Sequence, residues 1–407
     1  MCVGLLAPGT SLAAMGGMTA AGPEQIQEVI LRVKPSAVLI GVRLAGQATV
    51  SCGEEPARQV PIRPRSRTGS GFVIHPDGYI ATNAHVVGPA GGGLADTEME
   101  MVAREAAAAA CADRLAPLGA ARRDARITAL AKRPENRRGL RPVRQIQVTL
   151  QDGKALPATV LASRPPVLRR PAGKGDAEAR PPGDVAILKV EGRDLVAAPI
   201  ARVPLQIGDQ VFVIGFPGVV LEHELLSPRS RQAPSVTLGR VSGFKLDLAE
   251  QEVIQTDAAI TWGNSGGPAF NAQGEVIGVA TFISVAGEGA GVQGFNFLIP
   301  IERVTALAGT LGLAPTADSP AGRRWGAAVA AFFTGRYDAA IAELEAILRG
   351  DSTFPDARRL LAAARARPER GSQEWGRWMQ EMSGEGMQTR GGNGRGDPSG
   401  EGGPDRR

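Results

Sequence analysis

The stretch Thr256 to Pro268, TDAAITWGNSGGP, places one serine, Ser265, in a glycine-lined turn between two apolar runs that have the character of β-strands. Glycines on both sides of a serine allow a sharp turn and a close approach of another backbone. The amide groups of Gly263 and Ser265 can then point together at a negative charge developing on a carbonyl oxygen. The stretch therefore predicts a nucleophile held in a turn between strands.

A serine hydroxyl needs a base to become a nucleophile, and the chain contains three histidines. His85 stands in ATNAHVV, directly after a strand-like stretch. His75 lies in a His-Pro-Asp-Gly turn and His223 in a charged loop, so both are poorer candidates. Asp184 opens the apolar run GDVAILKV and could orient an imidazole. We therefore expect His85, Asp184 and Ser265 to form a catalytic triad.

Each of these residues also has a plainer interpretation. GNSGG could be an ordinary turn, because glycine, asparagine and serine all favour turns. His85 could be a core histidine beside two valines, and a catalytically inactive copy is a further alternative. Asp152 and Asp176 compete with Asp184 for the acid, but neither leads into an apolar strand. Because all three triad residue types are present, we favour the catalytic interpretation.

The order His85, Asp184, Ser265 is that of chymotrypsin-like proteases. The segments TGSGFVI, GYIATNAHVV, GDVAILKV, IQTDAAI, GNSGGPAFN, GEVIGVATFI and GFNFLIP resemble the trypsin-like core of HtrA/Deg-type serine endopeptidases. The resemblance covers roughly residues 24 to 310, with gaps at inserts. It implies a mainly β fold, a chymotrypsin-like double β-barrel, here with a helical insertion and a small all-α C-terminal unit. It also implies cleavage of unfolded or damaged proteins.

The chemistry that this resemblance implies is acyl transfer to water. His85 would take the proton of Ser265, Asp184 would hold the imidazole, and the backbone amides of Gly263 and Ser265 would form the oxyanion hole. Neither a metal nor an organic cofactor is needed. The sequence has no HExxH, no CxxC pair and no P-loop.

Substrate preference can be predicted from the residues around the primary pocket. Ala259, six residues before Ser265, takes the place of the pocket floor in chymotrypsin-like enzymes. Thr281, Phe282 and Ile283 should form the opposite wall. Nothing at these positions attracts a cation, so we expect a loose preference for small to medium aliphatic residues.

The domain organisation departs from the family between His85 and Asp184, which lie 99 residues apart (184 minus 85). Glu98 to Lys132 contains strong helix formers and predicts one or two inserted helices. An Asp152-Gly153 turn predicts a hairpin after this insert. We expect the following units: 1–23, a flexible N-terminal segment; 24–310, a trypsin-like serine protease domain with a helical insert at about 90–142 and a loop insert at about 164–183; 311–322, a linker; 323–367, a tetratricopeptide-like helical unit; and 368–407, a disordered tail.

The segment from Trp325 to Ala366 has the small and large residue pattern of a tetratricopeptide hairpin. It stands where HtrA-type chains usually carry a PDZ domain, and we recognise no PDZ-like segment. One repeat alone must pack on the protease domain or on another copy of the chain. A peptide-binding module and a helical appendage that covers apolar surface are equally consistent with this pattern.

Composition sets fewer limits. The net charge of +5 is spread over 407 residues, and the dense arginines between Arg104 and Arg180 are not interleaved with aromatics, so we expect a solvated basic insert and no nucleic-acid partner. No apolar run approaches the roughly 18 residues that a membrane span needs. Three cysteines, Cys2, Cys52 and Cys111, lie far apart in the sequence and define no disulfide framework.

Localisation and assembly depend on analogy. Residues 1–18 contain no Lys or Arg and show no clear signal peptide. Family analogy favours the periplasm or cell envelope, and a cytoplasmic enzyme is the alternative. The chain has no aromatic residue before Phe72, so a trimer through an aromatic N-terminal contact is doubtful, and we expect a monomer or an oligomer held by the C-terminal helices. The alternative function is a catalytically silent, chaperone-like scaffold that recruits unfolded protein or peptide clients.

Overall fold

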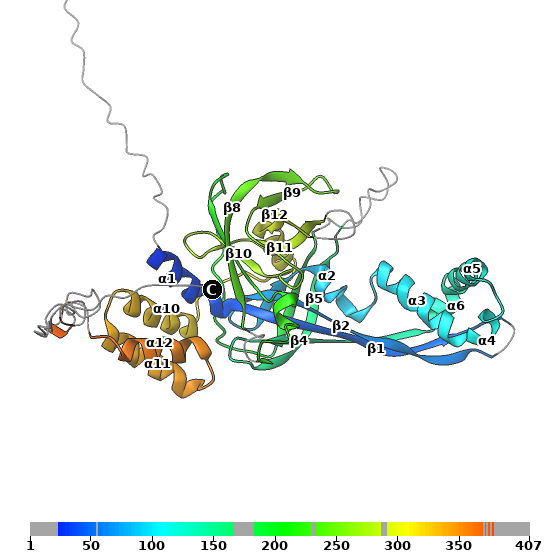
Figure 1. Cartoon of the computed structure of the whole chain (residues 1–407), viewed down its shortest axis with the longest axis horizontal. Helices are drawn as coiled ribbons and strands as arrows, with labels where there is room; N and C mark the ends of the chain where they lie inside the picture. Colours follow the sequence, from blue (N-terminus) through cyan, green and yellow to red (C-terminus); the bar gives the residue numbers. More distant parts are fainter. Residues whose placement is uncertain are drawn as a thin grey trace, which may run out of the picture.

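The computed structural model describes residues 23–53, 56–166, 183–228, 233–285 and 291–368, with a few isolated positions beyond. Two closed six-stranded β-barrels form the centre of the molecule (Figure 1). The predicted mainly β, double-barrel fold is therefore confirmed. The helices of the described chain lie on either side of the barrels, and none of them is long and apolar enough to cross a membrane.

The first barrel has the strand order β1-β2-β3-β6-β5-β4, with antiparallel neighbours throughout. Its strands have these bounds: β1 Ala37–Val50, β2 Arg58–His75, β3 Tyr79–Thr82, β4 Leu140–Thr149, β5 Ala155–Arg164 and β6 Val185–Val190. The turn between β4 and β5 contains Asp152 and Gly153, as predicted, and Gly153 has φ +84°. Glycine adopts such a positive φ without steric cost, because it has no Cβ atom.

The second barrel has the order β10-β11-β12-β9-β8-β7. Its elements are β7 Gln210–Gly215, α7 Gly218–Leu221, β8 Ser235–Leu246, β9 Glu252–Thr256, β10 Pro268–Phe270, β11 Val276–Val285 and β12 Gly291–Pro300. A single apolar cluster runs from the first barrel into the second, from Phe72 and Ile187 to Phe212 and Phe270, whose rings stack at 5.3 Å. This cluster joins the two barrels at their seam, while each barrel also has an apolar cluster of its own.

The insert after His85 forms a helical arm, which we define as α3 to α6 together with the parts of β1, β2 and β4 that carry them. Its helices, with the short elements before them, are α2 Ala84–Val87, η2 Ala90–Gly92, α3 Asp96–Ala110, α4 Ala112–Leu115, α5 Ala120–Ala131 and α6 Pro134–Arg138. The arm projects from the barrels (Figure 1) and has its own apolar core, in which alanines of α3 meet Leu44, Val50 and Ile62. The insert thus contains more helices than predicted.

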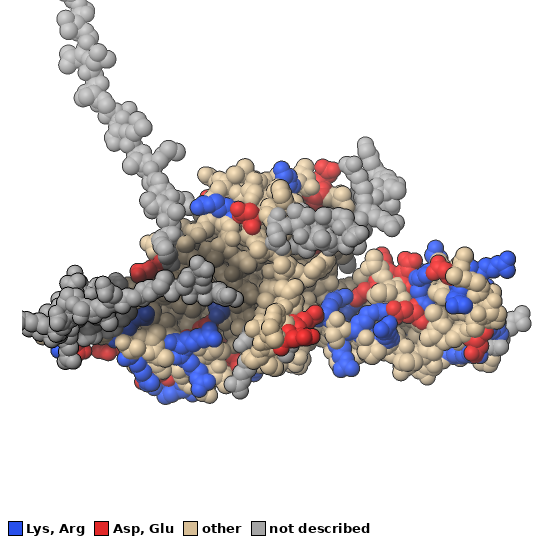
Figure 2. Space-filling view, viewed as in Figure 1, with Lys and Arg blue, Asp and Glu red and all other residues tan. Residues whose placement is uncertain are grey.

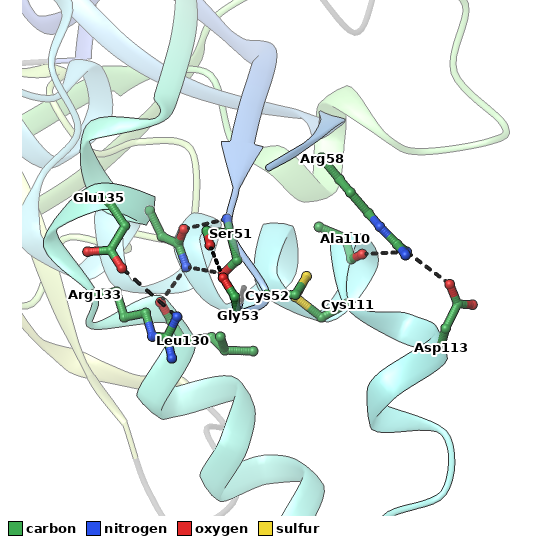
Figure 3. Close-up of a disulfide and its surroundings, with 11 residues drawn as sticks. Ser51, Cys52, Gly53, Arg58, Ala110, Cys111, Asp113, Leu130, Arg133 and Glu135 are labelled. Atoms are coloured by element: carbon green, nitrogen blue, oxygen red, sulfur yellow. Dashed lines mark hydrogen bonds and ion pairs between the residues drawn. A yellow bond between two sulfur atoms is a disulfide. The ribbon is translucent and has the colours of Figure 1, made fainter. Parts of the chain in front are cut away.

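A disulfide joins Cys52, just after β1, to Cys111, between α3 and α4, across 59 residues of sequence (Figure 3). Both sulfurs lie inside the core of the arm. The expectation that the cysteines define no disulfide was wrong here. Sequence distance concealed the pair, because β1 and the inserted helix come together only once the arm has folded. Cys2 lies outside the described residues.

Three helices follow α9 Ile301–Gly309 and form the C-terminal unit: α10 Pro320–Phe333, α11 Tyr337–Gly350 and α12 Pro355–Arg365. They pack with α1 Pro23–Val33, which leads into the 3-10 turn η1 Lys34–Ser36. The indole of Trp325 donates to the carbonyl of Leu31 at 2.9 Å, and Lys34 pairs with Asp356 at 2.9 Å. α1 of the same chain therefore packs on part of the apolar surface of this unit, through Leu31, and an oligomer held by the C-terminal helices stays a prediction.

Candidate active site

His85 lies on α2, a single helical turn that follows β3. Its backbone N–H donates to Asp184 Oδ1 at 3.0 Å, and its ring Nδ1 lies 2.8 Å from Asp184 Oδ2. A carboxylate beside Nδ1 favours the tautomer that carries its proton there, so Nε2 is left as an acceptor. The side chain is 42% exposed, so the imidazole is accessible from solvent.

Asp184 stands directly before β6 and is buried. Its φ of +45° is left-handed, a conformation that aspartate tolerates better than most residues. Asn83 fixes the backbone by donating to the Asp184 carbonyl at 2.8 Å, and the Thr281 hydroxyl donates to Oδ2 at 2.8 Å. The carboxylate therefore accepts three hydrogen bonds, two of them from His85, and is held against the imidazole.

Ser265 lies in a turn that only glycines can form. Gly263 has φ +97° and Gly266 has φ +88°. A Cβ on Gly266 would lie 2.2 Å from the carbonyl oxygen of Ser70, and one on Gly263 would lie 2.4 Å from that of Phe216. A larger residue at Gly266 would clash with the first barrel, and one at Gly263 with the segment after β7, so these glycines are needed for steric reasons.

The hydroxyl of Ser265 donates to the carbonyl oxygen of Thr281 at 3.1 Å. In the described part of the chain it makes no hydrogen bond with His85. Hydrogen bonds between catalytic groups are often long or misaligned without substrate and tighten when it binds. To reach His85 Nε2, the Ser265 side chain would have to rotate away from Thr281.

The backbone N–H groups of Gly263 and Ser265 have no hydrogen-bond acceptor among the described residues. The peptide between Trp262 and Gly263 is anchored on its other side, because Gly218 N–H donates to the Trp262 carbonyl at 2.7 Å. In a trans peptide the N–H points opposite to the C=O. The Gly263 N–H is thus aimed away from Gly218 and free to bind an oxyanion.

The structure describes only some of the side chains predicted for the primary pocket. Ala259 is exposed, and its carbonyl accepts from the Thr237 hydroxyl at 2.8 Å. Thr281 is buried, with its hydroxyl on Asp184, a contact that the sequence analysis did not foresee. Phe282 and Ile283 lie in β11, but their side chains are outside the described residues. The aliphatic pocket therefore remains a prediction.

The rival candidates lie elsewhere. His75 remains in its turn, where Nδ1 accepts from the Asp77 N–H at 3.2 Å, and the Nδ1 of His223 accepts from Leu225 N–H at 3.2 Å. Asp152 lies in the β4–β5 turn, and Asp176 is outside the described residues. Within the described ranges, no three His, Cys, Asp or Glu side chains gather as metal ligands.

The geometry defines a class: a double barrel with a His-Asp pair beside a glycine-held serine. Residues 69–279 match the trypsin-like peptidase domain, which is more than half of the chain, and the chain belongs to this family. Its relatives are serine proteases of the HtrA/DegP type. The serine protease HhoA of Synechocystis is 30% identical over 277 residues, 65% of this chain and 48% of that protein.

A DegP-like periplasmic serine endoprotease of Chlamydia pneumoniae is 30% identical over 248 residues, 60% of this chain and 34% of that protein. Among solved structures, the HtrA-type protease AlgW with a tripeptide is 23% identical with a TM-score of 0.41, covering 70% of this chain and 63% of that one. The chain thus spans only a third to a half of the length of these curated relatives.

Proposed function

We propose that the protein is a serine endopeptidase that acts through His85, Asp184 and Ser265. The observation that carries the proposal is the meeting of three elements at one seam. These are an imidazole tied to a buried carboxylate at 2.8 Å, a serine in a glycine turn, and two backbone N–H groups without acceptors in the described chain. Each supplies one part of acyl transfer, and the family match supports their combination.

The reaction proceeds in two halves. Ser265 Oγ attacks the carbonyl carbon of the peptide bond while His85 Nε2 takes its proton, and Asp184 stabilises the imidazolium. The Gly263 and Ser265 N–H groups bind the oxyanion. His85 then gives the proton to the leaving amine, which departs and leaves an acyl-enzyme. A water molecule, deprotonated by His85, attacks the ester and releases the carboxylic acid and free Ser265.

The substrates are unfolded or damaged proteins, cut after Val, Ala, Ile or Leu, in protein quality control. Ala259 supports the absence of a preference for basic residues, since an alanine cannot pair with a cation. Trp262 lies next to Gly263 and is 68% exposed, so this side of the serine turn is accessible to a polypeptide from solvent. A shallow apolar pocket at Ala259 and Thr281 to Ile283, as predicted, would suit extended segments of varied sequence.

The disulfide supports an oxidising compartment such as the periplasm, because structural disulfides persist where thiols are not kept reduced.

Incubation of the pure protein with unfolded casein, beside Ser265→Ala and His85→Ala, tests the proposal. Mass spectrometry of the fragments would give the cut sites. We expect each substitution to lower kcat by about 10⁵ to 10⁶, and the double variant to lose no more than either single variant, because the residues act as a unit. Unchanged thermal unfolding would show that the fold survives.

Equal cleavage by wild type and Ser265→Ala would place the activity elsewhere. Cleavage by neither form, with client binding retained, would favour the scaffold alternative. A fragment map dominated by cuts after Lys or Arg would refute the predicted pocket.

A further inference from the structure

Ser70 lies in β2 of the first barrel and is fully buried, yet its polar groups bind the second barrel. Its N–H donates to the carbonyl of Ser265 at 2.8 Å, and its hydroxyl donates to the carbonyl of Gly263 at 2.7 Å. The same hydroxyl oxygen accepts from the N–H of Phe216 at 2.9 Å. The Ser70 side chain thus connects the turn that carries Ser265 to Phe216, the residue that follows β7.

The position of Ser70 is itself fixed. The Thr82 hydroxyl donates to the Ser70 carbonyl at 2.7 Å from β3, one residue before Asn83, which binds Asp184. A Cβ on Gly266 or Gly267 would lie within 3.2 Å of Ser70 atoms, so the two backbones are in direct contact. The hydroxyl group of Ser70 therefore has little freedom to turn, and its single proton is directed at Gly263.

Gly263 is held from two sides. Gly218 binds the carbonyl of the peptide before it at 2.7 Å, and Ser70 binds the carbonyl of the peptide after it at 2.7 Å. Together with the Asn264 N–H, which donates to the Thr261 carbonyl at 3.1 Å, these two contacts orient the peptide planes on either side of Gly263. A glycine backbone can adopt other conformations at little cost. The hydrogen bonds, rather than the residue type, must therefore select the conformation in which the Gly263 N–H has no acceptor.

We propose that Ser70 is a positioning residue that sets the oxyanion hole by fixing, from the opposite barrel, the peptide between Gly263 and Asn264. This inference rests on the proposed endopeptidase function. Ser70 does not touch substrate, because it is buried beneath the turn. It acts through Gly263 and Ser265, and its loss weakens binding of the tetrahedral oxyanion more than binding of the ground-state peptide.

The test is Ser70→Ala, assayed on a fluorogenic peptide with an aliphatic residue before the cleaved bond. Removal of one oxyanion-hole donor lowers kcat by about 10² to 10³. Because Ser70 acts indirectly, we expect kcat to fall roughly 10- to 100-fold, with KM changed less than about threefold. The affinity for a peptide boronic acid, which forms a tetrahedral adduct on Ser265, should fall by the same factor as kcat/KM. The affinity for the cleaved product peptide should stay the same.

Ser36→Ala is the matched control. Ser36 is equally buried, and its hydroxyl also donates to a backbone carbonyl, that of Val33, at 2.6 Å. A merely structural role for Ser70 predicts that both variants lower the melting temperature and leave kcat and boronate affinity unchanged. If Ser70→Ala does not fold, Ser70→Cys keeps a weaker donor at the same place. Its kcat should then fall less than tenfold, again with a matching loss of boronate affinity.

The outcomes separate the two proposals. An active wild type that loses turnover with Ser265→Ala but keeps full kcat and boronate affinity with a folded Ser70 variant would overturn only the role of Ser70. A KM effect without a kcat effect would also overturn it. An inactive wild type, or one whose activity survives Ser265→Ala, would overturn the proposed function and this inference together.

Discussion

The seam between the barrels and the helical arm are built in different ways. At the seam, hydrogen bonds join residues far apart in sequence: Ser70 with Gly263, 193 residues on, and Asp184 with Thr281, 97 residues on. The arm is held by an alanine-rich core, one disulfide and ion pairs at its surface. Directional bonds fix atoms to fractions of an ångström, whereas apolar packing and a covalent link mainly fix stability. The difference fits a site whose polar groups are oriented by hydrogen bonds, beside an insert that is held mainly by apolar packing and a disulfide.

The two regions meet at Glu98, in the first turn of α3. Its carboxylate binds Arg67 at 2.7 Å and also Arg144, whose side chain is only 2% exposed. Arg67 in turn donates to the carbonyl of Val86 at 2.7 Å, next to His85. Burial lowers the pKa of the Arg144 guanidinium, and the Glu98 carboxylate opposes this shift. The base of the arm therefore touches the helix that carries the imidazole.

Glu98→Gln should affect both the arm and the seam. It leaves two guanidinium groups facing each other without a carboxylate, and removing one partner of a buried ion pair destabilises by about 3–5 kcal/mol. Because Arg67 also holds Val86, we expect kcat to fall roughly tenfold, since small displacements of a catalytic group are costly. Denaturant unfolding and kcat measure the two effects.

Asp113→Asn is the control, because Asp113 is 79% exposed and pairs with Arg58 at the far end of the arm (Figure 3). It should change stability by less than about 0.5 kcal/mol and leave kcat unchanged. If Glu98→Gln kept wild-type kcat, the base of the arm would have no part in placing His85.

Replacing both Cys52 and Cys111 by Ala should loosen the arm and spare the site. Closing a loop of this length stabilises by about 2–4 kcal/mol, mainly through the unfolded chain. Hydrogen exchange should therefore quicken over α3 to α6 and stay slow in β6 and β11, while kcat stays within about twofold. A parallel loss of kcat would show that the arm and the seam unfold as one unit. Lys and Arg side chains gather on the arm in Figure 2. Ion pairs between exposed side chains contribute too little stability to compensate for the loss of the disulfide.

The sequence predicts the seam better than the arm. GNSGG and the apolar runs around it are local patterns with few structural solutions, so the strands and the three candidate residues could be placed before any coordinates. The contacts of Ser70 and Thr281 were missed, because a serine or threonine in a strand carries no local sign of its partner in the other barrel. The Cys52–Cys111 pair was missed for the same reason: it depends on how an insert folds back on a strand.

The smallest effect should come from the other end of β4, where Asp152 lies in the turn next to the C-terminal helices. Burial raises the pKa of the Asp152 carboxyl above its ordinary 3.8, and the nearby Asp351 adds to the shift. The fold therefore favours the protonated form. That stabilisation is fully present below pH 3.8 and is lost as pH rises through the folded pKa. At neutral pH the ionised group should be mildly unfavourable.

Asp152→Asn keeps the acceptor that Oδ1 offers to the Lys154 N–H at 2.8 Å and removes the charge. We expect its melting temperature to exceed that of the wild type by about 1 °C at pH 7, since solvent screens a partly exposed carboxylate. The difference should vanish when both proteins are compared well below pH 3.8, where Asp152 is protonated in the folded and in the unfolded chain. A gain that persists unchanged at acid pH would mean that the charge is not its cause. A variant less stable than wild type at pH 7 would mean that the ionised carboxylate stabilises the turn between β4 and β5, contrary to the direction of its pKa shift.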